Sequence, residues 1–580
     1  MTFNAAEKYQ SQIPALQTLV ALGFKPLSQA EAEAKRGKLR NALLDDVLIE
    51  QLLQINRFTH RGKPYAFDLQ DAHEALRRLR PTPDKIKGLK ATNQEVYDQL
   101  VLGTTITKTI DGDSKSYSFR YIDWEKPANN VFHVTAEMSI ERTGSLQTKR
   151  CDIVCFVNGI PFVVIENKRP TESLKKAGSQ LIGYQSEDNI PHLFHFAQVL
   201  MSMRRAEALY ATVGTPRKFW QNWRDEEDGD ESIAPVINRP LSDVEKAAIF
   251  SGDLTPARRF FDEMEREGPR AVTDQDRLIH ALCRPERLLD VVRRFTVFDG
   301  GVRKIARHQQ YFGIKAAIER VKQYDLGNVR KGGVIWHTQG SGKSLTMVML
   351  GRGLALDKDI VNPRIVIVTD RDDLDKQIRD TFKSCEMEPV RARSGTHLAD
   401  LIAAKTPLVT TIINKFASAL KGSALVDDDA NIFVLVDESH RTQSGRYGGL
   451  GDFAKKMRRL LPKACYLGFT GTPLLKKEKN TLHTFGGLIH SYTIDEAVAD
   501  EAVVPLLYEG RLVEQQITGN VIDSWFEKIT EGLTPEQAAD LKRKFSRMDA
   551  LSKTGQAIRA KAFDISEHYR QHWQGTGFKA

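Results

Sequence analysis

Short apolar runs alternate with helical segments over the second half of the chain. From about residue 300 onward, β-branched and aromatic residues cluster in five such runs, VIW (334–336), RIVIVT (364–369), LVTTI (408–412), IFVLVD (432–437) and CYLGFT (465–470). Strands that are buried on both faces of a parallel sheet show this continuous apolar pattern. The pattern therefore predicts an α/β fold with a parallel sheet.

The first half of the chain has a different pattern. Leucine and isoleucine at helical spacing predict helices at 43–56 and 92–102. Two apolar runs at 152–157 and 160–165, separated by Asn158-Gly159, predict a β-hairpin. Charged, turn-rich stretches follow at 224–231 and 263–277, the second expected to be part-helical with a break at Gly268-Pro269, and we place a domain boundary loosely in this region.

Composition excludes several classes of protein. The 580 residues are 41% hydrophobic and 27% charged, which is typical of globular domains, and no apolar run approaches the length of a membrane span. The first residues show no basic patch followed by an apolar stretch, so we expect a cytoplasmic protein with no membrane partner. Its five cysteines are scattered without a CxxC pair, which predicts reduced thiols, and its net charge of +9 weakly favours a polyanionic partner.

A phosphate-binding loop is expected after the strand at 334–336. The residues HTQGSGKS (337–344) follow that strand and precede an apolar helix. Backbone N–H groups of the small residues would surround the phosphates, Lys343 would reach the β- and γ-phosphates, and the Ser344 hydroxyl would ligate Mg²⁺. His337 stands where the pattern GxxxxGK[ST] has its first glycine. Because GKS triplets also occur by chance, the interpretation needs further support.

That support comes from three other segments in the expected order. Asp437 and Glu438 follow a buried strand, where the aspartate could hold Mg²⁺ and the glutamate could polarise the attacking water. The alternative is that these carboxylates only cap a helix. The segment 470–473 (TGTP) ends the next strand, and 307–310 (RHQQ) precedes the loop by about thirty residues.

These segments together resemble the first motor lobe of superfamily 2 helicases and translocases. The resemblance implies that Gln309 or Gln310 reads adenine, which of the two being open, and that 470–472 couple ATP hydrolysis to movement. It implies ATP-binding residues Thr338, Gln339, Gly340, Ser341, Gly342, Lys343 and Ser344, magnesium ligands Ser344 and Asp437, the catalytic Glu438, coupling residues Thr470, Gly471 and Thr472, and DNA-contacting residues Thr369, Arg371, Thr410 and Thr411.

A second candidate site lies in the hairpin. Asp152, Glu166 and Lys168 give the spacing D-x13-E-N-K of PD-(D/E)xK nucleases, in which two carboxylates bind Mg²⁺ and a lysine orients the water. A two-residue loop would place Asp152 opposite Ile165 and Glu166 on the wrong face, so we expect a three-residue loop or a bulge. The alternative is that these charged residues are simply solvated at strand ends.

A QxxxY element follows the hairpin. Gln180 and Tyr184 would share one helix face. Nucleases associated with motors contain the same element beside the metal site. Cys151 replaces the proline of the usual PD pair, a change that we expect to be tolerated because this proline makes no metal contact.

The order of the two sites resembles the restriction subunit of type I restriction-modification enzymes. The stretches 157–170, 334–347 and 492–511 carry this resemblance. It implies ATP-dependent translocation on double-stranded DNA, endonucleolytic cleavage, the cofactors ATP and Mg²⁺, and methyltransferase and specificity subunits as partners.

The resemblance also implies a domain organisation. We expect a PD-(D/E)xK endonuclease domain with helical elements at 1–260, a RecA-like lobe at 261–475, and a linker with an incomplete second lobe at 476–580. No QxxGRxxR pattern follows TGTP, so we expect ATP binding but poor hydrolysis. Two rival interpretations are a helicase with an amino-terminal adaptor, and a binding module with two degenerate sites.

Overall fold

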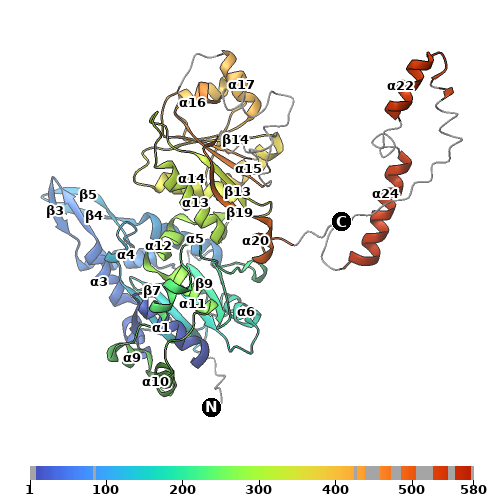
Figure 1. Ribbon diagram of the computed structural model, residues 1–580. Coiled ribbons are helices and arrows are strands. Elements are labelled where there is room, and N and C mark those ends of the chain that lie inside the picture. The colour runs from blue at the N-terminus through green and yellow to red at the C-terminus, as the bar shows by residue number, and fades with distance from the viewer. Residues whose placement is uncertain are drawn as a thin grey trace. The chain divides into compact units, whose positions relative to one another are not determined.

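The computed structural model describes residues 8–82, 86–422, 427–437, 457–471, 485–504, 527–528, 530–545 and 555–575. The chain forms two compact units, Met1–Asp500 and Glu501–Ala580 (Figure 1). The second unit contains the helices α22 (Pro535–Phe545) and α24 (Gly555–His568). Within the described ranges, every helix is too short or too polar to cross a bilayer. The domain boundaries expected at residues 260 and 475 remain predictions.

A mixed six-stranded sheet forms the core of the first half of the chain. Its strand order is β1-β6-β7-β8-β9-β10, with parallel pairs at β1/β6 and β8/β9 and antiparallel pairs elsewhere. The strands are β1 (Lys25–Leu27), β6 (Phe132–Glu141), β7 (Thr148–Val157), β8 (Ile160–Asn167), β9 (Val199–Arg204) and β10 (Glu207–Ala211).

Helices and two small hairpins surround this sheet. The helices expected at 43–56 and 92–102 are confirmed as α3 and α5. The break at Gly268 is confirmed, since α10 ends there and α11 starts after it. The helices are η1 (Lys8–Gln12), α1 (Ile13–Ala21), α2 (Gln29–Arg36), α3 (Asp45–Ile55), α4 (Leu69–Leu79), α5 (Leu89–Leu102), α6 (Leu174–Tyr184), α7 (Pro191–Phe194), α8 (Asp230–Ile237), α9 (Asp243–Ile249), α10 (Ala257–Glu267), α11 (Asp274–Cys283) and α12 (Pro285–Arg294), and the hairpins are β2 (Arg57–His60) with β3 (Lys63–Ala66) and β4 (Thr104–Ile110) with β5 (Asp113–Phe119).

The predicted hairpin is β7 with β8, and a bulge sets its register. The loop has two residues, Asn158-Gly159, with φ of +52° and +81°. Phe156 pairs with Pro161 but Cys155 pairs with Val163, so Phe162 is an extra residue in β8. The loop is therefore not the three-residue alternative, and the expected bulge is confirmed.

The second half of the chain forms an all-parallel sheet of seven strands, as the apolar runs predict. Its order is β15-β16-β14-β17-β18-β13-β19. In Figure 1, α5 and α12 lie between this sheet and the first one. The elements are β11 (Thr296–Asp299) and β12 (Val302–Ile305), which form a hairpin, α13 (His308–Val321), β13 (Gly333–His337), α14 (Lys343–Leu356), β14 (Arg364–Thr369), α15 (Asp372–Ser384), β15 (Val390–Arg391), α16 (Gly395–Ala403), β16 (Leu408–Ile412), α17 (Ile413–Gly422), β17 (Ile432–Val436), β18 (Cys465–Thr470), β19 (Leu488–Tyr492) and α20 (Ile494–Ala499).

Both faces of the parallel sheet are buried, which explains its continuous apolar runs. Ile335, Ile367 and Leu435 belong to a core that continues into the first half of the chain, whereas Val334 and Val366 belong to a second core on the other face. Alternate side chains of a strand point to opposite faces, so a strand covered on both sides needs apolar residues at every position.

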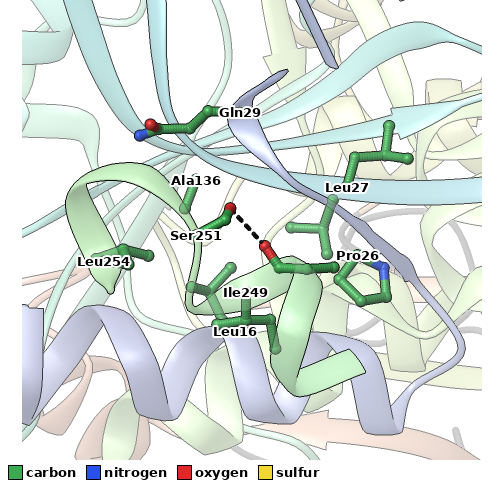
Figure 2. A pocket seen from close by; sticks show the side chains of 10 residues that line it. Leu16, Pro26, Leu27, Gln29, Ala136, Ile249, Ser251 and Leu254 are labelled. Carbon is green, nitrogen blue, oxygen red and sulfur yellow. Dashed lines mark hydrogen bonds between the residues drawn. The ribbon is translucent and has the colours of Figure 1, made fainter. Parts of the chain in front are cut away.

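A small gap remains where β1 packs on the surrounding helices. Figure 2 shows Leu16, Leu27, Ile249 and Leu254 around it, and the Ser251 hydroxyl donates a hydrogen bond of 2.9 Å to the Ala248 carbonyl. The space inside is about 10 Å³, which is no larger than one water molecule. This gap is a packing feature and not a ligand site.

Candidate active sites: a carboxylate cluster and a phosphate loop

The bulge in β8 brings the predicted nuclease residues together. Ile153 lies opposite Ile165, so the next pair along the ladder is Asp152 and Glu166. The backbone N–H of Asn167 donates to Oδ2 of Asp152 at 2.7 Å. Lys168 Nζ lies 2.9 Å from Oε1 of Glu166 and donates to the Asn167 carbonyl at 2.8 Å. The three side chains thus form one compact cluster at the end of the hairpin.

Burial makes this cluster electrostatically unusual. The side chains of Glu166 and Lys168 are 0% and 5% exposed, and charged groups this deeply buried are stable only when they are paired and hydrogen-bonded. The same burial and the same charges also affect the neighbouring thiol of Cys151. Burial, followed by the charges of Glu166 and Asp152, raises the pKa of the Cys151 thiol well above its usual range.

The QxxxY residues lie beside the cluster. Gln180 Nε2 donates to the Tyr184 hydroxyl at 2.6 Å, so the two residues share one face of α6 as predicted. The Tyr184 hydroxyl donates to the carbonyl of Arg150 at 3.1 Å, two residues before Asp152. Burial and the charge of Glu166 raise the pKa of Tyr184, which therefore keeps its proton. Through these two hydrogen bonds, Gln180 and Tyr184 connect α6 to the strand that carries Asp152.

Sequence reasoning missed a third acidic residue in the same row. Glu137 of β6 stands opposite Asp152, between the pairs Ala136–Ile153 and Met138–Cys151, and its φ is +56°. Its carboxylate accepts from Gln12 Nε2 at 2.9 Å and pairs with Arg150 Nε at 2.7 Å. One feature of the sequence could have identified Glu137, because an acidic residue within the apolar run of β6 is unusual.

A buried polar network supports the cluster from behind. Asn167 Nδ2 donates to the Ser11 hydroxyl at 2.8 Å, and this hydroxyl donates to Gln275 Oε1 at 2.6 Å. Gln275 Nε2 donates in turn to the Ser11 carbonyl at 2.9 Å. The three residues come from η1, β8 and α11, and no local sequence pattern links them. The network fixes the residue between Glu166 and Lys168.

The donor set at the cluster fits Mg²⁺. Across the described ranges, His, Cys, Asp and Glu side chains nowhere gather in threes that could hold a metal. Mg²⁺ needs fewer protein ligands, because it is usually bound by one or two carboxylates together with water and substrate phosphates. Asp152 and Glu166 supply these two carboxylates.

The phosphate loop has the geometry that its sequence predicts. Gly340 and Gly342 have φ of +81° and +88°, and a Cβ at Gly342 would come within 2.8 Å of Gln310 Nε2. Helix α14 begins at Lys343 with neither a capping side chain nor an acidic residue in its first turn. Its first N–H groups are therefore available to an anion. The Ser341 hydroxyl is buried and has no hydrogen-bond partner in the described part of the chain, which fits a bound phosphate.

The two candidate adenine-reading glutamines have different environments. Gln310 Nε2 donates to the carbonyl of Gly342 at 3.2 Å and to the Thr346 hydroxyl at 3.4 Å. The Gln309 side chain is 1% exposed, and its amide has no hydrogen bond among the described residues. Of these two described glutamines, Gln310 is the one whose side chain hydrogen-bonds to the phosphate loop.

The parallel sheet brings the other motor residues to the same edge. Asp437 follows β17 and is buried, and its N–H donates to the Val368 carbonyl at 2.9 Å. Thr470 ends β18 opposite Trp336 of β13, and a Cβ at Gly471 would lie 2.7 Å from Lys343 Nζ. Glu438 and Thr472 lie outside the described residues.

The expected DNA-contacting residues differ in exposure. Thr369, Thr410 and Thr411 are fully buried at the ends of β14 and β16, and only Arg371, which precedes α15, has an exposed side chain. Contact with DNA by these residues stays a prediction.

Comparisons with known proteins agree with this architecture. Residues 4–219 match the family described as type I restriction enzyme R protein N terminus, and residues 309–539 match SWI2/SNF2 ATPase. A Haemophilus influenzae protein named type I restriction enzyme HindI endonuclease subunit is 30% identical over 520 residues, which are 85% of this chain and 45% of that protein. A Methanocaldococcus jannaschii relative, named for the MjaIXP endonuclease subunit, is 28% identical over 597 aligned residues, 99% of this chain and 53% of the relative.

A solved structure also resembles part of the chain. The Sulfolobus solfataricus SWI2/SNF2 ATPase core in complex with dsDNA is 17% identical, covers 30% of this chain and 34% of its own, and has a TM-score of 0.24, which is too low to support a conclusion about function. This chain spans about half of the length of the curated relatives that it matches. The chain is therefore similar over nearly its whole length to type I restriction enzyme endonuclease subunits, and it contains a region of the type I restriction enzyme R protein N-terminal family and a region of the SWI2/SNF2 ATPase family.

Proposed function

We propose that this chain carries the nuclease and the ATP-binding centre of a type I restriction subunit, which cleaves double-stranded DNA endonucleolytically and uses ATP to translocate it. The observation that carries the proposal is the buried cluster of Asp152, Glu166 and Lys168 in one chain with a phosphate loop. Methyltransferase and specificity subunits are the proposed partners, and the cytoplasm is the proposed location.

At the nuclease site, Asp152 and Glu166 would hold Mg²⁺, which supplies a Lewis acid for attack on the phosphodiester. Lys168 places its ammonium 2.9 Å from Glu166 and would orient the attacking water towards the scissile phosphate. Tyr184 and Gln180 would keep the strand of Asp152 in register with that of Glu166. These roles of the five residues are proposals.

At the motor site, Lys343 would contact the β- and γ-phosphates, with Gly340, Ser341 and Gly342 around them. Thr338 and Gln339 complete the loop. Ser344 and Asp437 would ligate Mg²⁺, and Glu438 would polarise the attacking water. Coupling to movement would use Thr470, Gly471 and Thr472, and contact with one DNA strand would use Thr369, Arg371, Thr410 and Thr411. Of the two glutamines, Gln310 is the proposed adenine-reading residue because its amide contacts the loop.

The test is cleavage of supercoiled plasmid by the whole restriction subunit, assembled with its methyltransferase and specificity partners, Mg²⁺ and ATP. Lys168→Ala should abolish cleavage while leaving ATP hydrolysis, and Lys343→Ala should abolish both. Lys176→Ala is the matched control, because this lysine is 64% exposed on α6 and, among the described residues, forms an ion pair with Glu172 alone. Cleavage by Lys168→Ala at the wild-type rate would refute the nuclease assignment and favour a helicase with an adaptor domain.

A further inference from the structure

A six-residue segment at 223–228, which we name the acidic strap, lies between the two regions matched by known families. The sequence predicts only a charged, turn-rich boundary here. In the structure, its charged side chains pair with elements next to the parallel sheet. These ion pairs are Arg224–Glu496 (3.2 Å), Asp225–Arg287, Glu227–Arg287 (2.6 Å), Glu227–Lys315 (2.6 Å) and Asp228–Arg284 (2.6 Å).

One residue of the acidic strap starts a hydrogen-bond chain to the phosphate loop. Glu226 Oε2 lies 2.8 Å from Nε2 of His490 in β19. Nδ1 of His490 lies 2.9 Å from Nε2 of His337. His337 is the last residue of β13, and the phosphate loop begins at the next residue. The chain thus connects the acidic strap to the position where the usual loop motif has a glycine.

The carboxylate determines the direction of the first hydrogen bond, and the surroundings of His337 determine that of the second. An ionised carboxylate only accepts, so His490 Nε2 must carry a proton and donate it to Glu226. A proton on Nδ1 of His337 would be a buried N–H with no acceptor among the described residues, so the proton of this ring belongs on Nε2, which donates to Nδ1 of His490. Nδ1 of His337 is left as a bare acceptor, and this buried atom has no hydrogen-bond partner within the described ranges. The acidic strap therefore sets the tautomer of His490, whose Nδ1 accepts the hydrogen bond that orients the His337 ring.

Packing leaves the two rings little freedom. The side chain of His337 is fully buried, and the ring centroids of His337 and His490 lie 5.1 Å apart. On the other side is Gly313 of α13, where a Cβ would come within 3.1 Å of His337 Cε1 and 3.4 Å of His490 Nδ1. A glycine at this place lets α13 approach the histidine pair closely.

We propose that Glu226, His490 and His337 are positioning residues through which the acidic strap orients the phosphate loop for ATP. The inference rests on the proposed binding of ATP at this loop. The acidic strap follows β10 of the first sheet. The hydrogen bonds from Glu226 through His490 to His337 therefore also connect the half of the protein that contains the proposed nuclease site to the proposed nucleotide site. Loss of the Glu226 carboxylate should weaken ATP binding although this group touches no part of the loop.

Calorimetric titration of the 580-residue chain with ATP and Mg²⁺ tests the proposal. Glu226→Ala should raise the Kd about tenfold, as expected for the loss of one hydrogen bond to a charged group. Glu226→Gln keeps an acceptor oxygen, and because neutral hydrogen bonds are about half as strong, it should raise the Kd only about threefold. Glu227→Ala is the matched control, since its partners are Arg287 and Lys315. It should lower the melting temperature and leave the Kd unchanged.

A double-mutant cycle separates positioning from simple stabilisation. Glu226 and His337 contact each other only through His490, so the effects of Glu226→Ala and His337→Ala on the Kd should be non-additive, and additive once His490→Ala is present. A wild-type Kd in Glu226→Ala, or an equal rise in Glu227→Ala, would overturn this inference and leave ATP binding intact. Absence of ATP binding by the wild-type chain would overturn the proposed nucleotide site and this inference with it.

Discussion

Asn167 offers a sharp test of the network behind the carboxylate cluster, because its side chain is fully buried and donates at 2.8 Å to the Ser11 hydroxyl. Asn167→Ala removes this hydrogen bond and leaves a small cavity, which together cost about 2 kcal/mol. The unit Met1–Asp500 has an unfolding entropy of about 1 kcal/mol/K at about 2.1 cal/mol/K per residue, so 1 kcal/mol shifts its melting temperature by about 1 °C. We therefore expect a decrease of about 2 °C for the alanine variant.

Asn167→Asp has almost the same shape and should be worse. It replaces a donor by an acceptor opposite Ser11 and adds a further carboxylate beside those of Asp152 and Glu166, at a cost of about 3–5 kcal/mol at pH 8. The pKa of the introduced carboxyl would be raised in the folded state, because its charged form is desolvated and repelled. Stability relative to wild type should therefore recover as the pH falls and the carboxyl takes up a proton.

Differential scanning calorimetry at pH 8 and pH 5 measures both effects. The control is Asn222→Asp, the same change at an exposed asparagine, which should shift the melting temperature by less than about 0.5 °C at either pH. A melting temperature of Asn167→Asp equal to that of wild type at pH 8 would refute the idea that this amide is a buried donor in a fixed network.

Three further predictions concern other described residues. Gln310→Ala should raise the Kd for ATP about tenfold, because Gln310 bonds the Gly342 carbonyl, whereas Gln309→Ala should alter only thermal stability; equal Kd values in a titration would contradict the assignment of Gln310. Tyr184→Phe should lower plasmid cleavage by the assembled enzyme about tenfold with little change in melting temperature, and an unchanged rate would remove this hydroxyl from the positioning of Asp152. Burial raises the pKa of Asp98 from 3.8 to about 6. The carboxyl therefore keeps its proton to a higher pH in the folded protein than in the unfolded chain, and the free energy of unfolding decreases as the pH rises between these two pKa values. Asp98→Asn should therefore raise the melting temperature at pH 7 and leave it unchanged at pH 3, and a lower value at pH 7 would contradict the sign.

The sequence was most informative where burial on both faces leaves a continuous apolar run. Residues 364–369, 408–412 and 465–470 form the strands predicted for them, because each lies inside a parallel sheet with a core on either side. The edge strand β19 escaped prediction. Its sequence LIHSY is mixed in polarity, and its pairing with β13 depends on tertiary contacts that no local pattern encodes.

Some residues of the candidate sites could also be predicted from the sequence, and others could not. Asp152, Glu166 and Lys168 could be found because each lies at a fixed spacing around one hairpin. Ser11 and Gln275 could not, because they are 264 residues apart and meet only through the packing of η1 on α11. Short-range motifs therefore predict the candidate catalytic groups, while the residues that hold them in place become visible only in three dimensions.

The bulge at Phe162 has a consequence for mutational tolerance. Every residue of β8 is buried, and apolar side chains occupy both faces of its neighbour β7 from Ile153 onward. Because Phe162 has no partner in β7, its deletion would leave a regular ladder in which Cys155 still pairs with Val163 and Asp152 still lies next to Ile153–Ile165 on the side of Glu166. The carboxylate pair should therefore survive the loss of one residue from this part of β8. The insertion of one more residue would instead carry Glu166 to the opposite face of the sheet from Asp152, where apolar neighbours on both faces would still allow the strand to pack. Length changes of opposite sign in the same strand should thus have opposite effects on the candidate site.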